Sequence, residues 1–140
     1  MDWYAKEEGY AMRVDVLGVA FDNVTMDEAA DRALAMLEED RPHLVATPNP
    51  EIVQRANQDP EFAGILAKAD LVVPDGVGVI YAAKILGRPL KARVPGIDLA
   101  SSLLSRIAGT GKRLFLLGAA PGVAEQAAVN LRAAYPGLVV

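Results

Sequence analysis

The stretch "ADLVVPDGVGVI", residues 69–80, carries an apolar run into a Pro-Asp-Gly turn and then into a second apolar period. Residues 70–73 have the composition of a short buried strand, and residues 76–87 place apolar side chains at helical spacing. A buried strand, a tight turn and a helix make up the repeating unit of an α/β protein. The stretch therefore predicts that fold, with Asp75 at the carboxyl end of a strand.

The same alternation extends along the chain in both directions from this stretch. Strands are predicted within 13–25, where a turn or small hairpin follows, and at 43–47, 70–73, 112–118 and 138–140. Helices are predicted within 26–39, 49–57, 59–69, 76–87, 97–111 and 119–137, and residues 88–96 form a loop rich in Pro and positive charge. Strands that alternate with helices predict a Rossmann-like, mostly parallel sheet flanked by helices on both faces.

Three helix starts have clear capping signals. Thr25 is a predicted N-cap, with Glu28 at the capping-box position. Asn49 is an N-cap followed by Pro50, which suits the first helical position, and Asp59 repeats the same arrangement for the next helix.

The length of 140 residues predicts one domain, which we place at 12–140, after an N-terminal extension at 1–11. The final apolar residues, 138–140, begin a strand after which a parallel sheet normally continues. We therefore expect the domain to be incomplete at its C-terminus. An exposed sheet edge of this kind is prone to self-association, so a homo-oligomer is expected.

Composition excludes several classes of protein. The net charge of −4 gives no basic patch for nucleic acid, so no nucleic-acid partner is expected. The chain has no cysteine and a single histidine, His43, which excludes thiolate sites and sites built from several histidines. The apolar stretch 114–124 is interrupted by Gly and Pro, and it is shorter than the ~18 residues of a spanning helix.

Polar or glycine-rich sequence follows three of the predicted strands, at 47–49, 74–76 and 118–122. In an open parallel sheet, ligands bind beyond the carboxyl ends of the strands, where helix N-termini can hold a phosphate. The candidate site residues at these three ends are Thr47, Asn49, Asp75, Gly76, Gly118 and Gly122. Each also has a purely structural interpretation as a turn or cap residue, and for the 118–122 loop that interpretation is a tight strand-to-helix turn.

Asp75 has two interpretations that the residues alone leave open. It can cap the helix that follows, or it can act as a catalytic base at the mouth of a crevice. Arg93, in the loop 88–96, is either a solvated cation or a ligand for an anion. General motifs do not decide between these, because the chain has no G-x-G-x-x-G, Walker, Asp-x-Asp or Ser-elbow sequence.

Four segments together match a known pattern: "VATPNPEIV", "DLVVPDGVGV", "RVPGIDL" and "LFLLGAAPGVAEQAAVNLRAAYPG". In this order and spacing they resemble the WecG/TagA/CpsF glycosyltransferases, glycosyltransferase family 26, over nearly all of residues 12–140. The resemblance implies transfer of a sugar, often N-acetylmannosamine, from a UDP donor to a polyprenyl-diphosphate-linked N-acetylglucosamine. It implies inversion without a metal ion or other cofactor, at the cytoplasmic face of the membrane, in wall teichoic acid, common antigen or exopolysaccharide synthesis.

The resemblance also implies roles for residues. Asp75 of "VPDG" matches the family's proposed general base, and Thr47 and Asn49 of "ATPN" match neighbouring pocket residues. Arg93 of "RVPG" matches a basic residue suited to a diphosphate, and the Gly118–Gly122 turn matches the nucleotide end. Family members are longer, which agrees with a missing C-terminal part. Two alternatives remain: an inactive nucleotide-binding module of the same fold, and a dinucleotide-dependent oxidoreductase, which the absent G-x-G-x-x-G disfavours.

Overall fold

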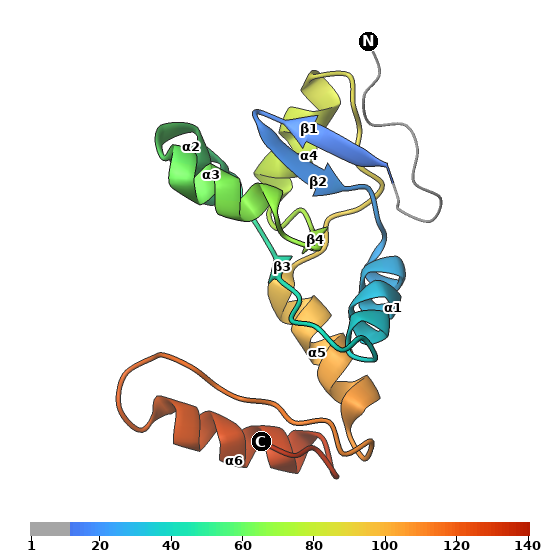
Figure 1. Cartoon of the computed structure of the whole chain (residues 1–140), viewed down its shortest axis with the longest axis vertical. Coiled ribbons are helices and arrows are strands. Elements are labelled where there is room, and N and C mark those ends of the chain that lie inside the picture. Colours follow the sequence, from blue (N-terminus) through green and yellow to red (C-terminus); the bar gives the residue numbers. More distant parts are fainter. Residues whose placement is uncertain (1–11) are drawn as a thin grey trace. The chain divides into compact units, whose positions relative to one another are not determined.

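The structure is a computed structural model that describes residues 12–140; the predicted extension at 1–11 lies outside the described residues. Figure 1 shows the elements in chain order. They are β1 (Arg13–Val16), β2 (Val19–Asp22), α1 (Met26–Met36), β3 (Val45–Ala46), α2 (Pro50–Gln58), α3 (Pro60–Ala67), β4 (Leu71–Val72), α4 (Val77–Ile85), α5 (Gly96–Ile107) and α6 (Val123–Ala134).

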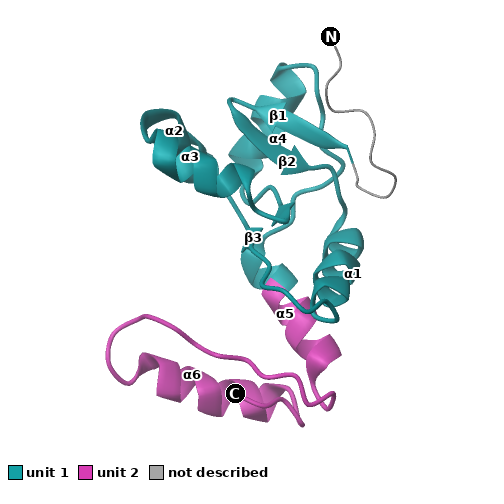
Figure 2. Ribbon diagram, viewed as in Figure 1, with its two compact units in different colours: residues 1–99 teal, residues 100–140 magenta. Residues whose placement is uncertain are grey.

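The chain divides into two compact units, residues 1–99 and residues 100–140 (Figure 2). The first unit holds all of the named strands and helices α1 to α4, and the second holds α6. Helix α5 begins in the first unit and ends in the second. The prediction of a single domain over 12–140 stays a prediction.

The first unit begins with a hairpin, as the sequence predicted. Strands β1 and β2 pair antiparallel with Val16 opposite Val19, and the side chains of β1 alternate between exposed and buried. The two residues between the strands, Leu17 and Gly18, have φ values of 52° and 86°. Positive φ at both positions suits a tight hairpin turn, but a leucine rarely adopts it.

Strands β3 and β4 form a parallel pair, with Val45 opposite Leu71. A side chain joins this pair to the hairpin: Asp22, at 1% exposure, accepts a hydrogen bond from the backbone N–H of Val72 at 2.8 Å. Arg32 donates to the same carboxylate at 2.9 Å. A buried carboxylate is stable only when it is paired in this way, so Asp22 fixes where β4 lies relative to β2.

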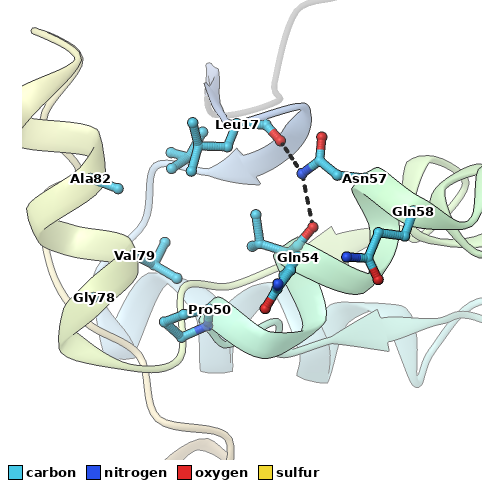
Figure 3. A pocket seen from close by; sticks show the side chains of 10 residues that line it. Leu17, Pro50, Gln54, Asn57, Gln58, Gly78, Val79 and Ala82 are labelled. Carbon is cyan, nitrogen blue, oxygen red and sulfur yellow. Dashed lines mark hydrogen bonds between the residues drawn. The ribbon is translucent and has the colours of Figure 1, made fainter.

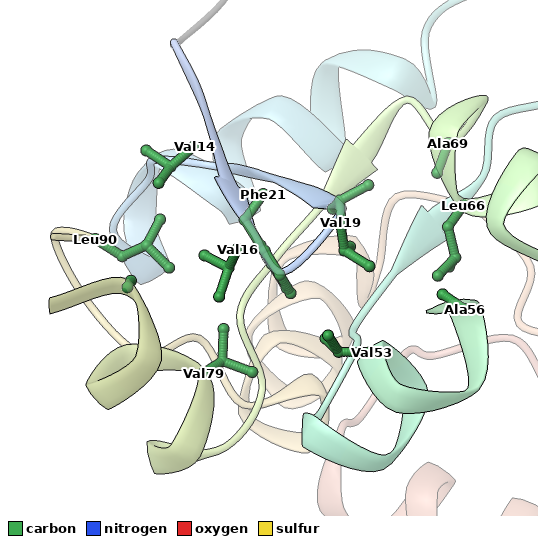
Figure 4. Close-up of a cluster of buried hydrophobic side chains, with 12 residues drawn as sticks. Val14, Val16, Val19, Phe21, Val53, Ala56, Leu66, Ala69, Val79 and Leu90 are labelled. Carbon is green, nitrogen blue, oxygen red and sulfur yellow. The ribbon is translucent and has the colours of Figure 1, made fainter. Parts of the chain in front are cut away.

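The hydrophobic core of the first unit lies between the hairpin and helices α2, α3 and α4 (Figure 4). Phe21 is fully buried at its centre, and Val53 of α2 and Val79 of α4 pack into the same cluster. The cluster contains buried apolar side chains from six elements, and Val72 of β4 is one of them, so this packing holds β4 in place.

The predicted helix starts are confirmed. Thr25 and Glu28 form a reciprocal capping box at the start of α1. The side chain of Asn49 accepts a hydrogen bond from the N–H of Ile52 at 2.9 Å, and Asp59 caps α3 in the same manner. These signals act within one helical turn, so they can be detected in the sequence without knowledge of the fold.

The α/β character of the chain is confirmed, because helices and strands alternate along the first unit. The strands form two separate two-stranded sheets, one antiparallel and one parallel. The continuous Rossmann-like sheet with helices on both faces stays a prediction.

The second unit corrects one prediction. The segment 112–118 is not a strand: among residues 12–140, its only β-pairing is a single parallel bridge between Arg113 and Val139. Phe115 and Leu117 are 83% and 91% exposed. A strand needs a hydrogen-bonded neighbour along its length, and one residue of the 138–140 segment does not provide it. Two of the apolar side chains that suggested a strand are therefore on the surface.

Candidate active site

Three loops meet in the first unit at the carboxyl ends of β3 and β4. The backbone N–H of Asp75, after β4, donates to the carbonyl oxygen of Pro48, after β3, at 3.1 Å. The N–H of Val94, in the loop before α5, donates to the carbonyl of Pro74 at 2.8 Å. These two bonds hold the loops 47–49, 74–76 and 93–96 together. The prediction that the segments 47–49 and 74–76 lie close together is therefore confirmed.

The Asp75 side chain is half-buried and points to the start of α5. Its Oδ2 atom accepts a hydrogen bond from the backbone N–H of Gly96 at 3.1 Å. Among the described residues, its Oδ1 atom has no hydrogen-bond partner. One oxygen therefore fixes the orientation of the carboxylate, and the other is available to accept a proton.

The prediction that Asp75 caps its own helix is wrong. The N-cap of α4 is Gly76, with φ of 102° and no side-chain capping bond. A capping side chain reaches the second or third helical N–H, and Asp75 lies one residue too early to do so. The positive φ of Gly76 turns the chain, and the Asp75 carboxylate reaches the first N–H of α5 instead.

Thr47 lies directly against the start of α5. A Cβ atom placed on Gly96 would come within 2.9 Å of Thr47 Oγ1 and 3.1 Å of its Cγ2. Glycine at this position allows the helix to approach the end of β3 until the Asp75 carboxylate can receive the Gly96 N–H. The sequence analysis placed Gly96 at the end of the loop 88–96 and gave it no role, whereas it is the first residue of α5.

Glycines also allow a close approach between α2 and α4, where Gly76 and Gly78 pack against Pro50. The ring carbons of Pro50 lie 3.2 Å from a Cβ placed on Gly76 and 2.8 Å from one placed on Gly78. The two helices therefore start side by side, with Asn49 and Gly76 as their N-caps. Asn49 is occupied as a cap through its Oδ1 atom, whereas α4 has no side-chain cap.

Arg93 is exposed on the loop that precedes α5, next to Val94. No ion pair with another described residue involves its guanidinium group. The structure thus places a cation on the same loop that bonds to the end of β4. Its role as an anion ligand stays a prediction.

Gly118 and Gly122 belong to the second unit. They have φ values of 103° and 85°, and between them Ala119 has φ of 66°. Gly122 is the N-cap of α6, which has no side-chain cap. The predicted helix after this turn is confirmed, but the described residues 112–117 that precede the turn form no strand, and its predicted contact with a nucleotide stays a prediction.

The side chain of His43 is 8% exposed and lies beside two carboxylates. Its ring nitrogens are 3.2 Å from carboxylate oxygens of Glu39 and Asp70. Backbone donation from Leu44 and the guanidinium of Arg41 hold the pKa of the Asp70 carboxyl well below its usual range. This cluster ties the residues before β3 to those before β4, so its role is structural.

Two further observations bear on cofactors and membranes. Within residues 12–140, no three side chains of His, Asp or Glu come together as a metal-ion site. None of the helices in this part of the chain has both the length and the apolar character required to cross a bilayer.

The fold and the site define an α/β protein with one carboxylate at a strand end, beside closely packed helix N-termini. A sequence model of the Glycosyl transferase WecG/TagA/CpsF family matches residues 14–140. The chain belongs to this family, as its motifs indicated.

Individual relatives support the same assignment. The N-acetylglucosaminyldiphosphoundecaprenol N-acetyl-beta-D-mannosaminyltransferase of Bacillus spizizenii is 36% identical over 104 residues, which are 74% of this chain and 40% of that protein. The protein of the same name from Staphylococcus aureus is 33% identical over 135 residues, which are 95% of this chain and 53% of that protein. The chain spans about half the length of the curated relatives it matches.

Proposed function

We propose that this chain carries the catalytic base of an inverting glycosyltransferase. The enzyme would move N-acetylmannosamine or a related hexose from a UDP donor to a polyprenyl-diphosphate-linked N-acetylglucosamine. The names of the relatives support the sugar and the acceptor, and the motif resemblance supports the UDP donor. The observation that carries the proposal is the Asp75 carboxylate: the Gly96 N–H holds one oxygen, and the other has no hydrogen-bond partner within residues 12–140.

In the transfer step, the acceptor hydroxyl gives its proton to Oδ1 of Asp75 as its oxygen bonds to the anomeric carbon of the donor. The bond between that carbon and the diphosphate oxygen breaks, and its electron pair leaves with UDP. Attack from the face opposite to the leaving group inverts the anomeric configuration. Thr47 and Asn49 belong to the loop that accepts the hydrogen bond of the Asp75 N–H, and there they would orient a sugar.

The departing diphosphate requires positive charge, which we assign to Arg93 and to helix N-termini. Arg93 is exposed on the loop bonded to the end of β4, and α4 begins without a side-chain cap. Free N–H groups at a helix start and a guanidinium group both stabilise a diphosphate. The Gly118–Gly122 turn would contact the nucleotide. With these groups, the reaction does not require a metal ion.

Two wider features belong to the same proposal. The parallel pair of β3 and β4 would be part of a larger Rossmann-like sheet, of which this chain supplies a part. A lipid-linked acceptor and a nucleotide donor meet only at the cytoplasmic surface of a membrane, so the enzyme would be peripheral on that surface. The pathway class that follows is cell-surface polysaccharide or wall teichoic acid synthesis.

The decisive experiment has two stages. The chain is titrated with UDP by calorimetry, with NAD as the competing nucleotide. UDP-N-acetylmannosamine and a short-prenyl diphosphate-linked N-acetylglucosamine are then supplied, and the disaccharide product is measured. Specific UDP binding with product formation supports the proposal. UDP binding without product favours a nucleotide-binding module, and saturable NAD binding in place of UDP contradicts the assignment.

A further inference from the structure

A cavity of about 410 Å³ lies beside the candidate active site, within the first unit (Figure 3). It is bounded by the tip of the β1–β2 hairpin, one side of α2 and one side of α4. Its volume is in the range of small-molecule pockets. Pro50 borders it and also packs against Gly76, which follows Asp75. Pro50 thus belongs both to the cavity lining and to the packing of the residue next to Asp75.

The lining of the cavity is predominantly apolar. Val53 and Val79, both buried, belong to the lining. Figure 3 shows Val79 and Ala82 on α4 and Leu17 at the hairpin tip. The polar groups at the cavity are side-chain amides of α2, and no charged residue lines it. Such a predominantly apolar lining without charge suits an uncharged hydrocarbon ligand.

The hairpin tip is held over the cavity at a conformational cost. Leu17 has φ of 52°, a conformation that asparagine, aspartate or glycine adopts more readily. The amide Nδ2 of Asn57 donates to the carbonyl oxygens of Leu17 at 2.8 Å and of Val53 at 2.9 Å (Figure 3). Strained residues that surrounding contacts hold in place occur preferentially at ligand sites.

The surface beside the cavity is also apolar. Val77, Tyr81 and Ile85 are spaced four residues apart on α4, so they share one face, and they are 53%, 61% and 85% exposed. Ala82 and Gly78, which line the cavity, are on the adjoining face of the same helix. A hydrocarbon that enters the cavity would thus pass along an exposed apolar stripe.

We infer that this cavity binds the isoprenoid segment next to the diphosphate of the acceptor lipid. The inference rests on the proposed function, which brings a polyprenyl diphosphate to Asp75, close to Pro50 at the edge of the cavity. The apolar stripe on α4 would then face the lipid surface from which the chain enters. In this arrangement, the cavity sets the distance between the lipid surface and the sugar hydroxyl at Asp75.

The test measures binding, with farnesyl diphosphate as the probe and inorganic pyrophosphate as the head-group control. Methyl NMR signals of the chain report the location, and titration reports the affinity. Farnesyl diphosphate is expected to shift the signals of Val53 and Val79, and pyrophosphate is not. Shifts confined to the surroundings of Asp75 and Gly96, with both probes, would overturn the inference and leave the proposed function intact. Absence of any farnesyl diphosphate binding would also overturn the inference.

Two variants and one matched control sharpen the test. Ala82→Leu fills the cavity and is expected to weaken farnesyl diphosphate binding by about tenfold, the loss for about two buried methylene groups. Ala35→Leu makes the same change at an exposed position of α1, away from the cavity, and is expected to bind like wild type. Leu17→Asn removes an apolar wall and keeps a residue that tolerates positive φ, so it should fold and bind less tightly.

The variants also separate this inference from the proposed function. Asp75→Asn leaves the cavity lining unchanged and is expected to keep farnesyl diphosphate affinity. Wild-type binding in Ala82→Leu and Leu17→Asn would overturn the inference, whatever the transfer assay shows. If farnesyl diphosphate binds in the cavity but the chain neither binds UDP nor forms product, the inferred isoprenoid site stands and the proposed transferase function is contradicted.

Discussion

The carboxylate of Asp75 accepts a hydrogen bond at 3.1 Å from the backbone N–H of Gly96, the first residue of α5. Asp75 follows β4, so this bond joins the end of a strand to the start of a helix that lies twenty-one positions further along the chain. It leaves Oδ1 of Asp75 without a partner among the described residues. The relationship accounts for both the position and the chemical availability of the proposed base.

Asp75→Asn is expected to lower sugar transfer by ~100- to 10,000-fold, the range for loss of a general base. The asparagine oxygen can still accept the Gly96 N–H, so the unfolding midpoint should stay close to wild type. Asp75→Ala leaves that N–H without its acceptor and is expected to lose ~0.5–2 kcal/mol of stability as well, as for a lost helix cap. Steady-state transfer rates and denaturant unfolding measure both effects. Near-normal turnover of Asp75→Asn would remove Asp75 from the mechanism.

Gly96→Ala is expected to destabilise the chain by ~1–3 kcal/mol, because the new methyl group would lie 2.9 Å from Thr47 Oγ1. Thr47→Ala removes the atoms nearest to that methyl group. In a double-mutant cycle of the two changes, we therefore expect a favourable coupling energy of ~0.5–3 kcal/mol. Denaturant unfolding of the four proteins gives this value. Strictly additive effects would show that Thr47 does not restrict position 96.

Asp22→Ala is expected to destabilise the first unit strongly, because it leaves Arg32 and the Val72 N–H without their buried acceptor. Breaking a buried pair costs ~3–5 kcal/mol, and the partial exposure of Arg32 favours the lower end of that range. Asp22→Asn keeps one oxygen for the Val72 N–H and should cost less. Chemical denaturation measures both variants. A loss below ~1 kcal/mol for Asp22→Ala would contradict the role assigned to this carboxylate.

The stability of the chain should fall at acidic pH partly through Asp70. The Leu44 N–H at 2.9 Å and Arg41 at 2.8 Å lower the pKa of its carboxyl group in the folded chain. A lowered folded-state pKa stabilises the fold above the unfolded-state pKa of about 3.9, and this stabilisation is lost as the pH falls through and below that value. Asp70→Asn should therefore be less stable than wild type near neutral pH, and the difference should shrink by about pH 3.

Thermal unfolding from about pH 6 to about pH 3 tests this expectation, since the unfolded-state pKa lies within that window. Asp40→Asn, an exposed carboxylate in the same region, is the matched control and should follow the wild-type pH profile. Parallel pH profiles for wild type and Asp70→Asn would show that Asp70 contributes nothing to the acid sensitivity.

Local sequence signals were sufficient to predict the helix starts, the position of Asp75 and the family. The caps at Thr25, Asn49 and Asp59 act within one helical turn, so the helix starts could be predicted from adjacent residues alone. The strand at 70–73 and the turn after Val73 could also be predicted from adjacent residues, and they place Asp75 at the end of a strand. The family followed from the order and spacing of four motifs.

Features that depend on distant segments could only be decided by the tertiary structure. The segment 112–118 has the composition of a strand, yet pairing needs neighbours, and the described chain supplies one bridge. An aspartate just before a helix is typical of an N-cap, but the chain turns at Gly76, and the Asp75 carboxylate accepts a hydrogen bond from α5 instead. The closeness of Gly96 to Thr47 and the cavity behind Pro50 arise from helix packing, which no local pattern encodes.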